Sequence, residues 1–131
     1  VDIKKYIQKS FQKTGNIFLM ALEALFCLKE VDETLKNNLT QFIINYSIAF
    51  QIKNDIKDVE SDFKNGNYTL IVLYYLRENN LNDFNIEKIE KYRTLAQLKL
   101  EEYKNRTIDY LNKIDNSIYK DILINLTKIT L

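Results

Sequence analysis

Apolar residues recur at helical spacing along nearly the whole chain, and short polar stretches separate these repeats. With no Pro and only two Gly to interrupt it, the pattern predicts an all-α fold. The predicted helices cover residues 3–12, 14–28, 32–59, 68–78, 86–113 and 117–130. The polar breaks fall at 29–31, 60–67, 79–85 and 114–116. Because these breaks are short, we expect residues 1–131 to form a single domain without linkers or repeats.

The predicted helix at 32–59 carries apolar side chains on every side of its middle part. These residues are Phe42, Ile43, Ile44, Tyr46, Ile48, Ala49, Phe50 and Ile52. A helix that is apolar all round has no solvent face and is buried by its neighbours. We therefore expect the middle of this helix to be buried on all sides.

One polar stripe follows this apolar stretch. It consists of Gln51, Asn54, Asp55 and Asp58, which share a helix face through their spacing of three and four residues. A solvated helix end is the simpler explanation of such a motif taken alone. Since an ionised carboxylate is costly to bury without a partner, the stripe is also expected to face a wet internal cavity or a cation. Two carboxylates one turn apart suit a Mg²⁺ ion that keeps several waters and binds substrate phosphates.

Composition excludes several classes of function. The net charge of +1 provides no basic surface field, so nucleic-acid binding is disfavoured. The chain has no His, which removes the usual zinc sites and the serine and cysteine triads. No apolar run reaches about 20 residues and the start lacks signal-peptide order, so we expect a soluble, cytoplasmic protein without a transmembrane segment. Cys27 lies among apolar residues and is expected to be buried.

Ordered motifs resemble those of the trans-isoprenyl (polyprenyl) diphosphate synthase family. Residues 50–58, Phe-Gln-x-x-Asn-Asp-x-x-Asp, resemble the family's second aspartate-rich motif, Phe-Gln-x-x-Asp-Asp-x-x-Asp, which binds magnesium and the allylic diphosphate. Residues 62–70, Asp-x-x-x-Gly-x-x-Thr-Leu, resemble the segment that follows it in the family. Lys-Thr at 13–14 resembles a family pair whose lysine contacts diphosphate, and residues 96–128 are similar to the closing helices. The resemblance covers nearly the whole chain.

This resemblance implies the C-terminal part of an isoprenoid synthase fold, a helical bundle around a central cavity. It implies an enzyme that uses Mg²⁺ to condense an allylic diphosphate with isopentenyl diphosphate. The implied catalytic residues are Lys13 and Gln51, the diphosphate contacts are Lys13, Thr14, Gln51 and Lys64, and the magnesium ligands are Asn54, Asp55 and Asp58.

Two residues depart from the family's pattern. Asn54 stands where the family has the first aspartate of the motif, and an amide offers one neutral carbonyl in place of a charged carboxylate. Asn67 stands where the family has a lysine that touches diphosphate, although Lys64 lies nearby and could compensate. These departures leave a non-catalytic, regulatory subunit as the alternative function. A plain helical interaction bundle ranks last, because it requires the ordered motifs to coincide by chance.

The family's first aspartate-rich motif lies upstream of the Lys-Thr pair, and nothing before Lys13 supplies it. We therefore expect the chain to be the C-terminal half of a longer domain. The expected partners are isoprenyl diphosphate substrates and the N-terminal half, supplied by the same protein or by a partner subunit. By resemblance to the family, a homodimer is also expected.

Overall fold

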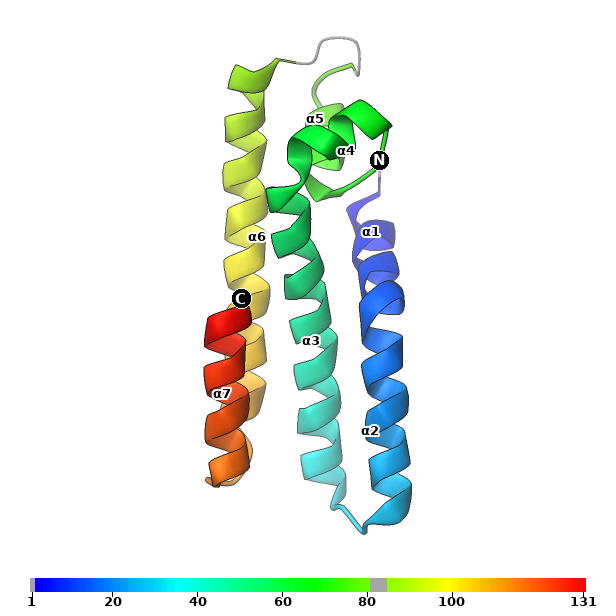
Figure 1. The fold of residues 1–131 in the computed structure, drawn as a ribbon, viewed down its shortest axis with the longest axis vertical. Helices are drawn as coiled ribbons and strands as arrows, with labels where there is room; N and C mark the ends of the chain where they lie inside the picture. Colours follow the sequence, from blue (N-terminus) through cyan, green and yellow to red (C-terminus); the bar gives the residue numbers. More distant parts are fainter. Residues whose placement is uncertain (1, 81–84) are drawn as a thin grey trace.

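The computed structural model describes residues 2–80 and 85–131, and every regular element within these ranges is helical (Figure 1). The elements are α1 (Ile3–Ser10), the π-helix η1 (Phe11–Gly15), α2 (Asn16–Leu28), α3 (Glu33–Lys57), α4 (Val59–Asn65), α5 (Leu70–Leu76), α6 (Ile86–Asn112) and α7 (Ile118–Thr130). The prediction of an all-α fold is therefore confirmed.

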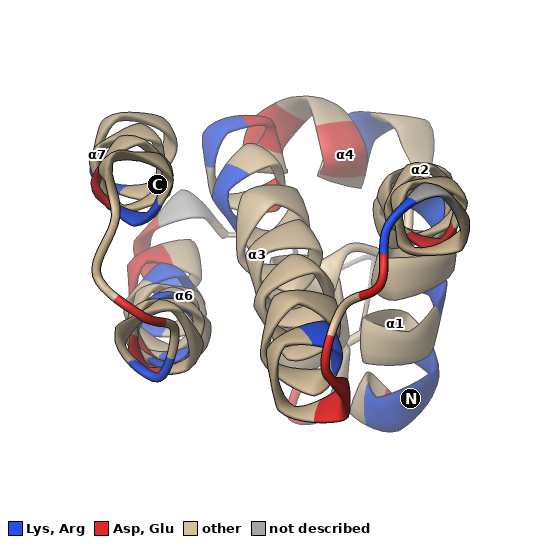
Figure 2. Ribbon diagram, turned by 90° about the horizontal axis from the view of Figure 1, so that it is seen from below, with Lys and Arg blue, Asp and Glu red and all other residues tan. Residues whose placement is uncertain are grey.

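The long helices stand side by side as upright columns (Figure 1). One column runs continuously through α1, η1 and α2, and α3 forms the next. The third column is α6, on which α7 folds back, and α3 packs most extensively against α6. The short helices α4 and α5 lie at the upper end, near the start of the chain. Seen from below, α3 lies between α6 and the first column (Figure 2).

The middle of α3 is buried, as its apolar pattern predicted. Every side chain from Asn38 to Ile52 is buried or half-buried, and the charged residues of α3 lie outside this stretch, which is uniformly tan in Figure 2. Buried polar side chains within it bond to the helix itself: Asn45 Nδ2 donates to Gln41 O at 2.8 Å and Ser47 Oγ to Ile43 O at 2.7 Å. These hydrogen bonds satisfy the polar groups that the burial of α3 removes from water.

The predicted break between the first two helices is absent. A π turn, η1, joins α1 to α2 without interruption. Gly15 ends this turn in close contact with its neighbours, because a Cβ there would collide with the Phe11 ring and lie 3.2 Å from Ser47 Oγ. The absence of a side chain thus lets the first column approach α3.

Part of the predicted break at 60–67 is also helical. Its charged residues indicated a loop, but α4 covers Val59–Asn65 because Val59 is buried and Phe63, one turn later, packs against the core. Gly66, with a φ of 69°, ends α4 in the left-handed conformation common after helices. Of the predicted break at 79–85, residues 81–84 lie outside the described residues.

The end of α7 is tied to α3. Lys53 Nζ donates to Thr130 O at 2.7 Å, and the Tyr46 hydroxyl shares a hydrogen bond of 2.8 Å with Thr130 Oγ1. Lys53, close in sequence to the aspartate motif, therefore binds the backbone of α7. Among the described helices, none combines the length and apolar character needed to cross a membrane.

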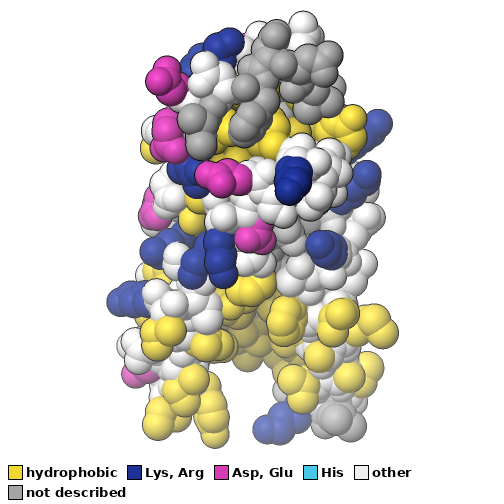
Figure 3. Space-filling view, turned by 45° about the horizontal axis from the view of Figure 1, so that its top comes forward, with side chains coloured by type: hydrophobic (Ala, Val, Ile, Leu, Met, Phe, Trp, Pro, Cys, Tyr) yellow, Lys and Arg dark blue, Asp and Glu magenta, His cyan; other side chains and the backbone are white. Residues whose placement is uncertain are grey.

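Large apolar side chains remain exposed on α2 and α7. They include Ile17, Phe18, Met20 and Leu25 on α2 and Ile118, Tyr119, Ile122, Leu126 and Ile129 on α7. Figure 3 shows hydrophobic side chains gathered at the lower end of the molecule, on both sides of a gap. Cys27, expected to be buried, is exposed because it also lies on α2, which packs on α3 through part of its surface.

Candidate active site

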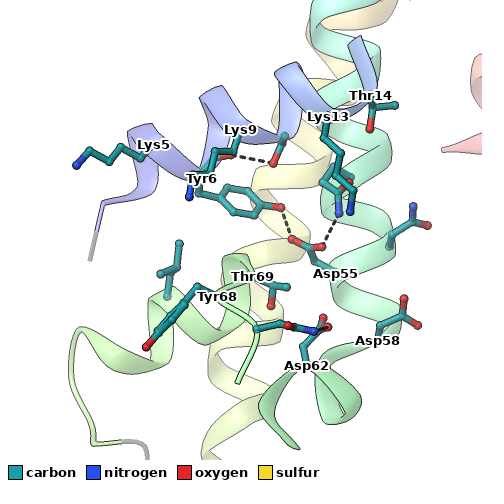
Figure 4. Close-up of a pocket in the computed structure, with 15 residues that line it drawn as sticks. Lys5, Tyr6, Lys9, Lys13, Thr14, Asp55, Asp58, Asp62, Tyr68 and Thr69 are labelled. Carbon is teal, nitrogen blue, oxygen red and sulfur yellow. Dashed lines mark hydrogen bonds between the residues drawn. The ribbon is translucent and has the colours of Figure 1, made fainter. Parts of the chain in front are cut away.

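An open cavity of about 930 Å³ lies between the first column, the C-terminal end of α3 and the segment that leads into α5 (Figure 4). The structure brings together six of the seven side chains that the sequence predicted for the site: Lys13, Thr14, Gln51, Asn54, Asp55 and Asp58. The seventh, Lys64, is exposed on α4 and does not line the cavity. Residues from distant parts of the sequence thus meet in one place.

Asp55 lies at the back of the cavity and is held by donors from three elements. The Tyr6 hydroxyl of α1 donates to Oδ2, Leu70 N at the start of α5 donates to the same oxygen at 3.3 Å, and Gln51 Nε2 donates to Oδ1 at 2.8 Å. The side chain is only 3% exposed. Asp55 therefore links α1, α3 and α5, and protein donors engage both of its oxygens.

Burial is the main cause of the raised pKa values of Tyr6 and Asp55. Burial raises the pKa of Asp55, whereas the three hydrogen bonds act in the opposite direction. Burial, and then the neighbouring charge of Asp55, also raises the pKa of Tyr6 far above its usual range. Tyr6 is therefore a permanent hydrogen-bond donor to Asp55 at neutral pH.

Three further polar side chains face the cavity from the same wall. Asn54, Asp58 and Asp62 follow one another at intervals of four residues, and Asp58 lies at the junction of α3 and α4. Within the described ranges, the side chains of Asn54 and Asp58 make no hydrogen bond or ion pair, and Asp62 Oδ1 accepts from Asn67 Nδ2 at 3.2 Å. These oxygens are therefore available to a ligand.

This donor set fits one kind of metal site. In the part of the chain that the structure describes, no three acidic or other metal-ligating side chains cluster closely enough to enclose an ion. Magnesium commonly binds through one or two carboxylates and takes its other oxygens from water and substrate phosphates. The carboxylates of Asp58 and Asp62 and the carbonyl of Asn54 fit such an ion.

The opposite wall is basic. Lys5 and Lys9 of α1 and Lys13 of η1 line the cavity at intervals of four residues. Lys13 extends toward the wall that carries Asp55 and Asp58, whereas the side chain of Lys5 points away from it (Figure 4). None of these lysines forms an ion pair with a described residue. The cavity therefore presents ammonium groups on one side and, on the other, the carboxylates of Asp58 and Asp62, none of them in an ion pair with a described residue. This arrangement is complementary to an anion that carries its own metal ion.

Sequence reasoning missed Tyr6, Lys5, Lys9, Asp62 and Thr69 as residues of the site. The regular spacing of the lysines and of the acidic residues was a usable signal, but Tyr6 lies in the apolar pattern of its helix and gave none. Thr69 lines the cavity, and its Oγ1 is buried without a hydrogen-bond partner among the described residues.

Replacing Tyr6 with phenylalanine is expected to lower the free energy of unfolding by about 1 to 2 kcal/mol at neutral pH, because Asp55 loses a buried donor. Since the pKa of Tyr6 is raised in the folded state, its contribution is complete below about pH 10 and decreases above it. The stability difference between wild type and Tyr6→Phe should therefore shrink by up to about 1.4 kcal/mol per pH unit above pH 10.

Urea unfolding at a series of pH values measures this difference. Tyr119→Phe is the matched control, because Tyr119 is 75% exposed and its hydroxyl makes no hydrogen bond to a described residue. Equal stability of the two variants at neutral pH, or a Tyr6→Phe difference that is constant up to alkaline pH, would contradict the proposed hydrogen bond.

Comparison with known proteins identifies the family. The polyprenyl synthetase family model matches residues 1–106. A prenyl transferase of Cyanophora paradoxa is 33% identical over an alignment of 90 residues that covers 60% of this chain and 28% of that protein. A decaprenyl-diphosphate synthase of Dictyostelium discoideum is 29% identical over an alignment of 160 residues that covers 98% of this chain and 34% of that protein.

A solved structure shares the fold. The geranylgeranyl pyrophosphate synthetase from the archaeon Geoglobus acetivorans superimposes with a TM-score of 0.84 at 24% identity, over 97% of this chain and 46% of that chain. The chain thus spans less than half the length of each of these relatives. The family match covers α1 to α5 and most of α6, including every residue of the cavity. The chain belongs to the polyprenyl synthetase family.

Proposed function

We propose that this chain supplies the diphosphate-binding half of a magnesium-dependent prenyltransferase, which condenses an allylic diphosphate with isopentenyl diphosphate. The observation that carries this proposal is the cavity itself, in which lysines of the first column face the carboxylates of α3 and α4. Membership of the polyprenyl synthetase family supports the same reaction. The relatives' names support prenyl diphosphates as the substrate class.

In this proposal the basic wall of the cavity binds phosphate and the acidic wall binds magnesium. Lys13 Nζ binds phosphate oxygens of the allylic substrate, and Thr14 lines the pocket beside it. Asp58, with Asn54 and Asp62, holds magnesium directly or through water. When bound, magnesium offsets the negative charge that develops on the departing diphosphate.

Asp55 and Gln51 act in this proposal as positioning residues. Gln51 Nε2 bonds to Asp55, and Asp55 binds α1 and α5 at the same time. This linkage fixes the distance between the lysine wall and the acidic wall. The mechanism requires no histidine, since charge on the leaving group is stabilised by cations and not by a proton from an imidazole.

The exposed apolar faces support a further part of the proposal. We expect α2 and α7 to pack against the remaining helices of a complete polyprenyl synthetase fold, because the related structure contains more than twice the length of chain that this protein matches. That contact would remove large apolar side chains from water. The single domain, the homodimer and the cytoplasmic location stay predictions of the sequence.

Asn54 favours a second candidate function, a non-catalytic subunit. The amide of Asn54 lies on the acidic wall of the cavity, where a carboxylate would bind a cation more strongly. In that case the cavity would bind diphosphate to regulate a catalytic partner. The non-catalytic subunit would therefore bind diphosphate as the enzyme does, but would not transfer a prenyl group.

Two measurements test both candidates: calorimetric titration with geranyl diphosphate, and incubation with geranyl diphosphate, labelled isopentenyl diphosphate and Mg²⁺ followed by separation of the products. The enzyme hypothesis predicts a longer, labelled prenyl diphosphate, and chelation of Mg²⁺ should abolish it. Binding of geranyl diphosphate without product would overturn the enzymatic role and support the subunit. Absence of both binding and product would overturn both candidates.

A further inference from the structure

Lys9 lines the cavity one helical turn before Lys13, and the mechanism above gives it no task. Its side chain extends from α1 beside Tyr6 on the basic wall (Figure 4). It is exposed and forms no ion pair within the described ranges. An ammonium group held at a cavity without an acidic partner is available to an anionic ligand.

The π turn aligns Lys9 with Lys13. In a regular α-helix, residues four apart are rotated by about 40° from one another, so a row of lysines at this spacing drifts around the helix. η1 covers Phe11–Gly15 and has more residues per turn than an α-helix, which offsets this drift between Lys9 and Lys13. Both residues line the same cavity, and four residues at a helical rise separate them by about 6 Å along the axis.

The other side of the cavity supplies no cation that could replace Lys9. Among the described residues that line the cavity, the basic ones all come from the first column. Asn67, across the cavity, is neutral and donates its amide to Asp62. Lys64 lies near Asn67 in sequence but not at the cavity. A ligand with two phosphate groups therefore meets its cations on one wall, where Lys9 and Lys13 are one turn apart.

We propose that Lys9 is a second diphosphate-binding residue, and that Lys9 and Lys13 each bind one phosphate group of the same diphosphate. This inference deepens the proposed function and rests on it. Two phosphates joined by one bridging oxygen lie closer together than the two helix positions, and the flexible lysine stems can converge on them. The pair would thus favour a diphosphate over a single phosphate.

Calorimetric titration with inorganic pyrophosphate and with orthophosphate, both with Mg²⁺, tests this inference. Lys9→Gln is expected to weaken pyrophosphate binding about tenfold, as the loss of one charge-assisted hydrogen bond, and to change orthophosphate binding by less than about threefold. Lys4→Gln, on the same helix but not at the cavity, should match wild type. Adding Asn67→Lys to Lys9→Gln should restore pyrophosphate binding, because position 67 lines the same cavity.

The possible outcomes distinguish a failure of the role of Lys9 from a failure of the proposed function. Wild-type protein that binds pyrophosphate, with Lys9→Gln indistinguishable from Lys4→Gln, would overturn the role of Lys9 and leave the proposed function intact. Equal losses for pyrophosphate and orthophosphate in Lys9→Gln would also overturn it, since they indicate a general effect of charge. Wild-type protein that binds no pyrophosphate would overturn the proposed function, and the role of Lys9 with it.

Discussion

Replacing Asp55 with alanine is expected to lower the free energy of unfolding by about 3 kcal/mol or more. The substitution leaves the Tyr6 hydroxyl, the Gln51 amide and Leu70 N without their shared acceptor. Two of these donors, the Tyr6 hydroxyl and Leu70 N, are buried, and each buried donor left unsatisfied costs about 1 to 3 kcal/mol. Three elements also lose their common contact. Burial already raises the pKa of Asp55, so the loss comes mainly from these donors and not from the carboxylate charge itself.

Asp58→Ala is the matched control for this prediction. Asp58 belongs to the same sequence motif, but its side chain is exposed and has no hydrogen-bond partner among the described residues. Its replacement should change the unfolding free energy by no more than about 0.5 kcal/mol. Denaturant unfolding of both variants measures the difference. Equal effects would show that Asp55 does not hold the helices together.

Lys13→Gln is expected to weaken binding of geranyl diphosphate about 10- to 100-fold. Hydrogen bonds to charged groups contribute about 1.5 to 3 kcal/mol, and each 1.4 kcal/mol corresponds to about a tenfold change in affinity. Lys13 lies where η1 faces the acidic wall, so its loss removes a cation across the cavity from the proposed magnesium position. The change should persist in EDTA, because the lysine contacts phosphate and not the metal.

Lys64→Gln tests the specificity of this effect. The sequence named both lysines as diphosphate contacts, but only Lys13 lines the cavity. Isothermal titration should therefore give wild-type affinity for Lys64→Gln. A loss of similar size in both variants would mean that net charge, and not the position of Lys13, controls binding.

The sequence predicted the helices well because burial leaves a periodic trace. α3 is the clearest case, since an all-round apolar stretch can only be buried. The short helix α4 was missed, because its charged residues conceal the single apolar pair, Val59 and Phe63, that packs it on the core. The π turn η1 was also missed, since it depends on how Phe11 packs around Gly15 and not on a local preference.

The site was predicted in part, for a related reason. A motif identifies which residue types belong to a site. It does not show which of their side chains form hydrogen bonds within the fold and which are left to bind a ligand. Asp55 and Asp58 are equivalent in the motif, yet only Asp55 meets a tyrosine from a helix 49 residues away in sequence. Such a contact is a tertiary event without a local signal. The regular spacing of Lys5, Lys9 and Lys13 is visible in the sequence. Their role at the cavity became apparent only from the structure, which places acidic residues on the opposite wall.

The most direct test of the central claim is the magnesium dependence of diphosphate binding in wild type and in Asp58→Asn. Asparagine keeps the size of the side chain and removes its charge, so the cavity should retain its shape. We predict that Mg²⁺ raises the affinity of wild type for geranyl diphosphate at least about tenfold over EDTA, and that Asp58→Asn loses most of this gain. Wild-type binding that is indifferent to Mg²⁺, or an Asp58→Asn variant that responds like wild type, would contradict the account.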